Sequence, residues 1–128
     1  MQMRNIIKTN KAPAAIGTYS QAVESNGILF TSGQVGIDPE TSEMVKGGVE
    51  DQAIRVLKNI YAILSESGLD KTSIIKLNVF LKDLDDFSIV NDTFKEFFGD
   101  NEYPARTTVE VSELPLGALI EIDCIASR

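Results

Sequence analysis

Histidine is absent from this sequence of 128 residues, and cysteine occurs once, as Cys124. Without an imidazole the chain can form neither a Ser-His-Asp nor a Cys-His catalytic group, and it has no histidine to bind a metal. A single cysteine excludes an intrachain disulfide and a cysteine-rich metal site. The chemistry that remains belongs to carboxylates, hydroxyls, amides, lysine and arginine, so we expect neither a metal nor another cofactor.

Basic residues are also scarce, because 12 Lys and Arg stand against 19 Asp and Glu and give a net charge of −7. Such a chain repels phosphate backbones over most of its surface, so we expect it to bind neither nucleic acid nor an anionic membrane. No apolar run approaches the ~20 residues of a membrane-spanning helix, and the opening MQMRNIIKTN has no apolar run of signal-peptide length. These features predict a cytoplasmic protein.

The composition is otherwise ordinary for a globular protein, with 43% hydrophobic and 24% charged residues. The sequence has no linker, low-complexity tract or internal repeat, and its length predicts one domain over residues 1–128. Near the start, the dipeptide Asn-Gly at 26–27 is a two-residue turn signal that predicts a hairpin between strands at 21–24 and 28–32. A loop is then predicted at Gly33, Gly36 and the Asp38-Pro39 pair.

Apolar residues recur at helical spacing in two segments, which predicts two amphipathic helices. The first covers residues 49–67 and is followed by Gly68, a residue typical of the position after a helix. The second is capped by Asp85 or Asp86 and ends at Gly99. Their apolar faces comprise Ala53, Val56, Leu57, Ile60 and Leu64 in the first helix, and Phe87, Val90, Phe94 and Phe97 in the second.

Further strands are predicted at residues 74–81, 105–111 and 119–126. One apolar face on each helix implies that both helices lie on a sheet, so the predicted fold class is α+β. In the last strand successive side chains alternate between two faces, and the face with Glu121 and Asp123 is polar. That face needs either water or a partner subunit against it.

Two charged residues are candidates for chemistry. Arg106 begins a strand directly after Pro104 and has small neighbours, so its planar fork could be presented to a carboxylate. It could equally be a surface arginine that pairs with Glu110. Glu121 lies between Ile120 and Ile122, where partial loss of water would let it accept a proton near neutral pH. The alternative is an outward-facing acid in an ordinary alternating strand.

Weaker candidates lie in turns and in the second helix. Tyr19 follows a Gly-Thr step, and Ser32 precedes Gly33, so each segment offers polar donors where the backbone can approach a ligand. Turn formation alone would also explain both segments. Asn91 is a poor residue for a helix interior, which suggests either a role in a site or simple exposure to solvent.

Together these segments resemble the RidA family (reactive intermediate deaminase A, also called YjgF) over nearly the whole chain. Five motifs carry the resemblance in order: GTYSQA at 17–22, TSGQVGIDP at 31–39, DFSIVN at 86–91, YPARTTVEV at 103–111 and LPLGALIEID at 114–123. The resemblance implies a chorismate-mutase-like α+β fold, with a mixed, mostly antiparallel six-stranded sheet and two helices packed on one face. It also implies a homotrimer with a central barrel and clefts between subunits.

The resemblance further implies a 2-iminobutanoate/2-iminopropanoate deaminase, which hydrolyses reactive imine and enamine acids from amino-acid dehydratases to 2-oxo acids and ammonia. By position, Arg106 would bind the substrate carboxylate and Glu121 would position the water. A non-catalytic module that binds 2-oxo acids or other small carboxylates is the alternative, and a chaperone or nuclease is a third possibility, although the charge of −7 argues against a nuclease. The implied substrate-binding residues are Tyr19, Ser32, Gly33, Phe87, Asn91 and Thr108, the last through its backbone because several family members have cysteine there.

Overall fold

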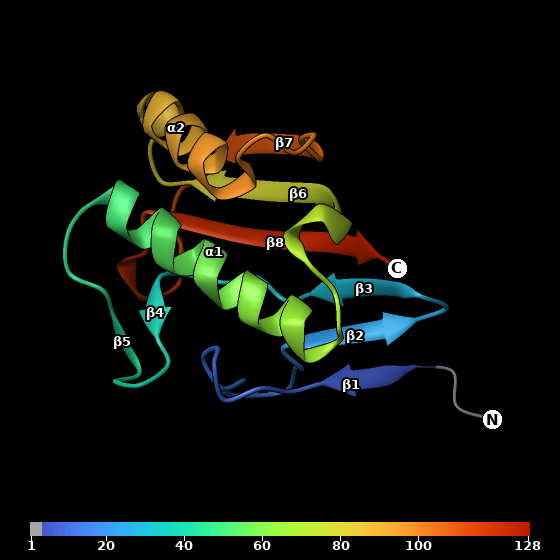
Figure 1. Ribbon diagram of the computed structural model, residues 1–128. Helices are drawn as coiled ribbons and strands as arrows, with labels where there is room; N and C mark the ends of the chain where they lie inside the picture. The colour runs from blue at the N-terminus through green and yellow to red at the C-terminus, as the bar shows by residue number, and fades with distance from the viewer. Residues whose placement is uncertain (1–3) are drawn as a thin grey trace.

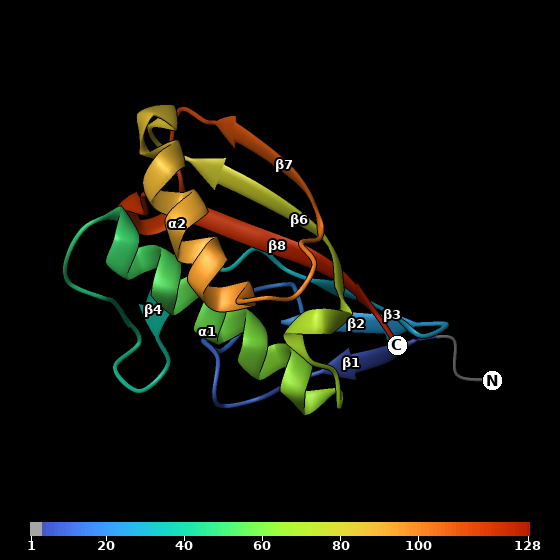
Figure 2. The same cartoon turned by 45° about the horizontal axis from the view of Figure 1, so that its top comes forward.

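The computed structural model describes residues 4–128. One six-stranded sheet has the order β1-β2-β3-β8-β6-β7, and all neighbouring strands are antiparallel except β6 and β7, which are parallel. Both helices lie on the same face of this sheet (Figures 1 and 2). This arrangement confirms the α+β prediction. Among residues 4–128, no helix combines the length and the apolar character needed to span a membrane.

The strands of the large sheet are β1 (Asn5–Ile7), β2 (Ala22–Ser25), β3 (Ile28–Thr31), β6 (Ile74–Leu81), β7 (Ala105–Glu110) and β8 (Ile120–Ser127). The helices are α1 (Val49–Glu66) and α2 (Phe87–Phe98). A separate two-stranded sheet contains β4 (Ile37–Asp38) and β5 (Glu43–Met44). Three single 3₁₀ turns complete the fold: η1 (Lys71–Ser73), η2 (Leu84–Asp86) and η3 (Pro115–Gly117).

The predicted hairpin forms between β2 and β3. Its two turn residues, Asn26 and Gly27, have φ angles of 53° and 78°, the left-handed conformation that a two-residue hairpin turn requires and that these residue types tolerate best. β6 has the predicted bounds, α1 and β7 each end one residue earlier than predicted, and β8 is shifted by one residue toward the C-terminus. These elements were predictable because each has a clear turn signal or a long apolar period.

Two short features were not predicted. β1 extends the sheet beyond β2, and the segment around Asp38, predicted as a loop, forms the β4–β5 hairpin with Ile37 opposite Met44. A hydrogen bond from Val45 N to Gly36 O, 2.9 Å long, continues that pairing. Strands of two or three residues have too few side chains to show an alternating pattern, so these segments have no hydrophobic period to detect.

The predicted apolar face of α2 needs correction. Val90, Phe94 and Phe98 are buried, whereas Phe97 is only partly buried and Phe87 remains 39% exposed. The buried positions follow the spacing of 3.6 residues per turn, and Phe98 therefore replaces Phe97 at the end of the stripe. Asp86 does occupy the position before the helix, but its side chain makes no capping hydrogen bond.

The two faces of the sheet differ sharply. Side chains of β8 alternate, so that Ile120, Ile122 and Cys124 are buried beneath the helices while Glu121 and Asp123 point to the opposite, open face. Cross-strand partners extend these two faces over the sheet. Arg106 of β7 lies opposite Leu77 of β6, which lies opposite Cys124 of β8, so these three side chains face the helices. Val109 of β7 lies opposite Phe80 of β6, which lies opposite Glu121 of β8, so these three side chains belong to the open face.

Candidate functional site

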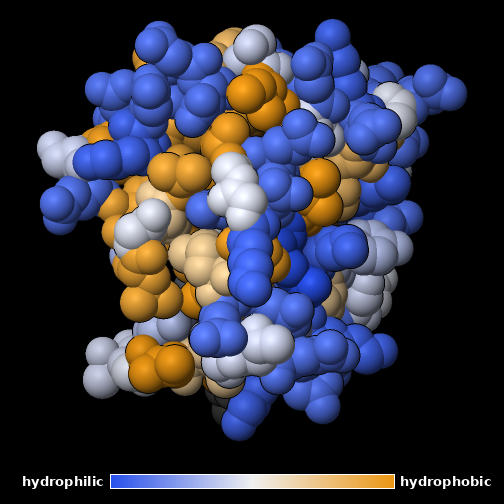
Figure 3. Space-filling view, turned by 90° about the vertical axis from the view of Figure 1, so that its left-hand side faces the viewer, coloured by the Kyte–Doolittle hydropathy of each residue, from blue (hydrophilic) through white to orange (hydrophobic). Residues whose placement is uncertain are grey.

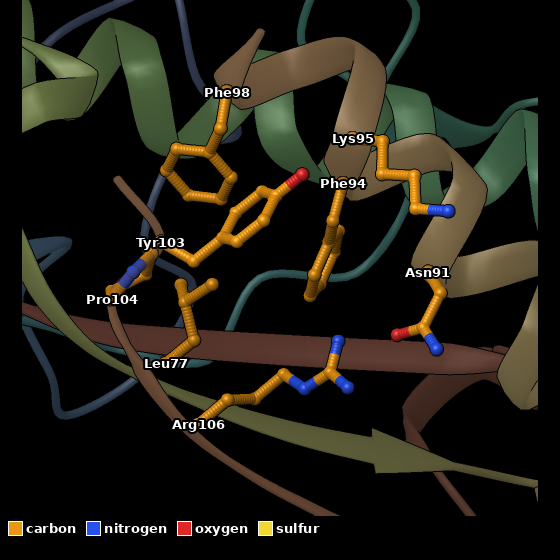
Figure 4. Close-up of a pocket in the computed structure, with 8 residues that line it drawn as sticks. All are labelled: Leu77, Asn91, Phe94, Lys95, Phe98, Tyr103, Pro104 and Arg106. Carbon is orange, nitrogen blue, oxygen red and sulfur yellow. The ribbon is translucent and has the colours of Figure 1, made fainter. Parts of the chain in front are cut away.

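A pocket of about 390 Å³ lies between α2 and the edge strand β7. Pro104 directs the chain into β7 in an extended conformation, and Arg106, two residues on, points from the strand toward α2 (Figure 4). α2 supplies the opposite wall with Asn91 and Phe94. The complete lining comprises Leu77, Asn91, Phe94, Lys95, Phe98, Tyr103, Pro104 and Arg106.

The Arg106 guanidinium is held by aromatic rings. Its central carbon lies 5.1 Å from the centroid of the Phe87 ring and 5.4 Å from that of Phe94, both within the range of a cation–π contact. Arg106 takes part in no ion pair among residues 4–128. Glu110, its suggested partner, instead accepts a hydrogen bond from Leu84 N at 2.8 Å. The rings orient the guanidinium and leave its donors available to an anion.

The pocket is locally cationic in an acidic protein. Its lining includes two positive side chains, Arg106 and Lys95, and no Asp or Glu. Asn91 and Tyr103 add polar groups beside Phe94 and the other apolar residues, so the pocket combines a positive end with an aromatic wall (Figure 4). Such a lining suits a small organic anion.

Sequence reasoning missed Lys95 and Tyr103 as pocket residues. Lys95 lies one helical turn after Asn91, so the spacing of four residues could have placed both on one side of α2. Tyr103 stands three residues before Arg106 in the same motif, but no local pattern indicates that the intervening turn folds its ring back toward Phe98, 6.1 Å away between centroids.

Glu121 does not line this pocket. On the open face its carboxylate lies against Gly33, so closely that a side chain at position 33 would overlap it. Partial burial raises the pKa of Glu121 above its usual value, and the negative charge of Asp123 raises it further. Asp123 is itself oriented by Asn78, whose Nδ2 donates a hydrogen bond of 2.7 Å to Asp123 Oδ1. A raised pKa makes this carboxyl a stronger proton acceptor when it is ionised, which is the property a general base needs.

Ser32 and Tyr19 lie in the neighbourhood of Gly33, away from the Arg106 pocket. Ser32 Oγ donates a hydrogen bond of 2.5 Å to Ser20 O, which holds the 19–20 segment beside the end of β3. Tyr19 is half exposed, and its hydroxyl accepts a hydrogen bond of 3.3 Å from Ile16 N. Tyr19 borders a separate hollow of about 600 Å³ beside the N-terminal strand.

Thr108 lies two residues beyond Arg106 on the same face of β7, in register with the buried Val79. Its hydroxyl is buried and makes no hydrogen bond within residues 4–128. The structure thus divides the predicted site residues into two groups. Arg106, Asn91, Phe87 and Thr108 lie on the helix side, whereas Glu121, Gly33, Ser32 and Tyr19 lie toward the open face or its margin.

Fold and site together define an α+β protein with two helices on one face of a mostly antiparallel sheet and an arginine-containing, aromatic pocket at the sheet edge. The sequence model of the family described as Endoribonuclease L-PSP matches residues 9–128. The chain belongs to this family, the RidA or YjgF family, as its motifs predicted.

Related proteins cover nearly the whole chain. A protein of Bos taurus named 2-iminobutanoate/2-iminopropanoate deaminase is 47% identical over 124 residues, which are 97% of this chain and 90% of the relative. A crystal structure of a conserved Rid-family protein from Yersinia pestis superposes with a TM-score of 0.96 at 46% identity, covering 98% and 99% of the two chains. The crystal structure of E. coli TdcF with bound serine gives a TM-score of 0.93 at 43% identity and covers 97% of this chain and 98% of the TdcF chain.

Proposed function

We propose that this protein is an imine deaminase that hydrolyses 2-iminobutanoate, 2-iminopropanoate and their enamine forms to 2-oxo acids and ammonia. The observation that carries the proposal is the Arg106 guanidinium, oriented by Phe87 and Phe94 in a pocket lined by no acidic residue. A planar guanidinium matches the two oxygens of a carboxylate, and every substrate of this class has one. The names of relatives at about 47% identity support the same activity.

The proposed active form is a homotrimer in which the open faces of three chorismate-mutase-like sheets enclose a central barrel. Two features of the single chain support assembly. The open face carries the half-buried Glu121 and Asp123 together with exposed apolar residues such as Phe30 and Val109, and neither helix covers it. Apolar side chains also gather at the end of the molecule where α2 begins (Figure 3), where Leu84, Phe87 and Leu116 are exposed. Exposed apolar side chains that gather on one surface are typical of a protein interface.

Assembly would also complete the active site. Arg106 and Glu121 point to opposite faces of one sheet, so a single chain does not bring them together. A neighbouring copy could dock the side of its open face that carries Glu121 against the β7 edge of the first chain. Its Glu121 group (Glu121, Gly33, Ser32 and Tyr19) would then lie opposite the Arg106 group of the first chain (Arg106, Asn91 and Phe87). A closed ring of identical interfaces of this kind gives each chain one complete cleft.

The chemistry then needs little more than placement. Arg106 holds the carboxylate through two charge-assisted hydrogen bonds, each worth about 1.5–3 kcal/mol. Water adds to the imine carbon, and Glu121 accepts the proton that this water loses. Glu121 returns that proton to the substrate nitrogen and then transfers the hydroxyl proton of the tetrahedral intermediate to the same nitrogen. The carbon–nitrogen bond breaks with its electron pair on nitrogen, the oxygen becomes the carbonyl, and the products are a 2-oxo acid and ammonia. Positioning removes part of the entropic barrier, and acid–base assistance contributes roughly 10²–10⁴-fold.

A binding module for 2-oxo acids or other small carboxylates is the second candidate. The specific observation in its favour is that the Arg106 pocket already exists in the single chain without Glu121. Hydrolysis needs the carboxyl of Glu121, whereas carboxylate binding does not. Glu121→Gln therefore separates the two: a deaminase loses rate and keeps its affinity for a 2-oxo acid, and a binding module keeps its affinity and has no rate to lose.

The test is a continuous assay in which an amino-acid dehydratase generates the imine and the formation of 2-oxo acid is followed. We expect Arg106→Ala to remove the acceleration while circular dichroism shows an intact fold. Arg4→Ala is the matched control, because Arg4 is an exposed arginine remote from both residue groups in the sequence, and it should behave as the wild type. Full acceleration by Arg106→Ala would contradict the proposal.

A further inference from the structure

Gly33 has no conformational need to be glycine. Six glycines in the described chain have positive φ angles, where other residues are strained, and Gly33 is not among them. An alanine could therefore adopt the same backbone conformation. The reason for glycine at this position must lie in the space around its α-carbon.

The Glu121 side chain lies in that space. A β-carbon added to Gly33 would overlap Glu121 Oε2, and it would lie 2.8 Å from Glu121 Cδ and 3.2 Å from Glu121 Cγ. These are its three nearest atoms, so the Glu121 side chain is the first group that an added β-carbon would meet. Separations this short are well inside the ~3.5–4.0 Å of an ordinary carbon–carbon contact.

The backbone on both sides of this contact is fixed. Ser32 N donates to Gln21 O at 2.9 Å on one side of Gly33. On the other side, Gln34 and Ile122 exchange two hydrogen bonds of 2.8 and 3.0 Å, and Ile122 adjoins Glu121 in β8. Neither strand can move away, so the Glu121 side chain must yield if position 33 gains an atom.

The carboxylate has no other anchor in the described chain. Glu121 forms no ion pair and accepts no hydrogen bond among residues 4–128. Its partner in register on β6 is the uncharged Phe80, and the charged neighbour on its own strand, Asp123, repels it. Contact with the bare backbone of Gly33 is therefore the feature that determines where the carboxylate lies.

We propose that Gly33 is a positioning residue whose missing side chain leaves a slot for the Glu121 carboxylate and so fixes its direction. This inference rests on the proposed function, in which Glu121 exchanges protons with the attacking water and the substrate nitrogen. It predicts that filling the slot impairs the chemical step and spares the fold, because only the end of a flexible side chain has to move.

The first test is Gly33→Ala in the coupled assay, with Gly48→Ala as the matched control, because a β-carbon at Gly48 meets nothing within 4 Å. We expect Gly33→Ala to lower kcat by about 10–100-fold, because a displaced carboxyl loses part of the roughly 10²–10⁴-fold acid–base assistance, with KM changed less than about threefold. Its melting temperature should stay within about 3 °C of the wild type. Gly48→Ala should keep both kinetic constants. An unchanged kcat for Gly33→Ala would overturn the proposal.

The second test is a double-mutant cycle with Glu121→Asp, which shortens the side chain by one methylene and withdraws it from position 33. If the slot acts through Glu121, Gly33→Ala should cost several-fold less in kcat on the Glu121→Asp background than on the wild-type background. A cost that is the same on both backgrounds would show that Gly33 acts independently of Glu121, which contradicts the proposal.

A third measurement separates this inference from the proposed function, because it needs no turnover. Titration of the Glu121 carboxyl by NMR should show its pKa lowered in Gly33→Ala relative to Gly48→Ala, since the carboxyl leaves its half-buried slot. Asp123 on the same strand is the charged group that faces it, and Phe80 and Gly33 carry no charge. If the pKa of Glu121 is the same in both variants, the inference about Gly33 is wrong, even if the protein has no deaminase activity. If Glu121→Gln has a low kcat and Gly33→Ala has the kcat of the wild type, the proposed function stands and only the inference about Gly33 is refuted.

Discussion

Arg106 and Glu121 face opposite sides of the same sheet. Arg106 stands in register with Leu77 and Cys124 beneath the helices, whereas Glu121 stands in register with Phe80 on the open face. Within one chain the proposed carboxylate anchor and the proposed base are therefore separated by the sheet itself. A reaction that uses both residues requires a second copy of the chain.

Substitution of Arg106 by lysine should be damaging although it keeps the charge. Lysine has no planar fork for two parallel hydrogen bonds, and its compact ammonium stacks less well on Phe87 and Phe94. We expect kcat/KM to fall by about 10–100-fold, mainly through KM. Lys95→Gln removes a charge from the same pocket and leaves the planar guanidinium of Arg106 in place, so it should raise KM only about threefold. Equal effects of the two substitutions in steady-state kinetics would argue against bidentate binding.

Glu121 should make the stability of the protein depend on pH. Its pKa is raised in the folded chain, first by burial and then by Asp123. A carboxyl of this kind stabilises the fold fully below its unfolded pKa of about 4.3, and that contribution is lost as the pH rises through the higher folded value. The melting temperature of Glu121→Gln relative to the wild type should therefore increase from pH 4 to pH 7 at fixed protein concentration.

The control for this measurement is Glu102→Gln, because Glu102 is exposed and its carboxyl stays in water. Its melting temperature relative to the wild type should be nearly the same at both pH values. If Glu121→Gln shows no greater change than Glu102→Gln, then Glu121 is not held in a partly buried place.

The buried hydroxyl of Thr108 should reduce stability. It makes no hydrogen bond within the described chain, and such a group costs about 1–3 kcal/mol. Valine has nearly the same shape, suits a strand and carries no hydroxyl, so Thr108→Val should raise the free energy of unfolding by about 1 kcal/mol. Urea denaturation measures this change. Activity should stay within about twofold of wild type if position 108 acts only through its backbone; a large rise in KM would instead show that the hydroxyl touches the substrate.

Cys124 should be chemically inert in the folded protein. Burial raises the pKa of its thiol to about 12, and only about one molecule in ten thousand would carry a thiolate at pH 8. An aromatic disulfide reagent should therefore release almost no chromophore from the native protein and one equivalent per chain in denaturant. Rapid labelling of the native protein would show that the packing between β8 and the helices opens readily.

Local signals in the sequence were sufficient to predict much of the fold. The Asn26-Gly27 turn, the apolar stripe of α1 and the β-branched run of β6 each determine their element through neighbouring residues. The face of α2 was partly wrong because Phe87 was assigned to the core. In the structure its ring stacks on Arg106, and that contact depends on how α2 packs against β7.

The candidate site was less predictable for a related reason. Alternation along β7 and β8 shows that each strand has two faces, but it does not show which face of one strand adjoins which face of the other. That relation is determined by the β6 register, where Leu77 meets Arg106 and Phe80 meets Glu121. The contact between Gly33 and Glu121 depends on the same long-range pairing, so the motif around Gly33 indicated only a turn.

Subunit complementation between two inactive variants tests the central claim most directly. Arg106→Ala and Glu121→Gln would be mixed in equal amounts, unfolded and refolded together so that subunits mix at random, and then assayed with the dehydratase. If each cleft takes Arg106 from one chain and Glu121 from its neighbour, each mixed trimer has one complete cleft in three, and about three quarters of the trimers are mixed, so about one quarter of all clefts regain both residues. The account predicts recovery of about one quarter of wild-type activity by this arithmetic. Activity no greater than that of the two variants assayed separately would contradict it.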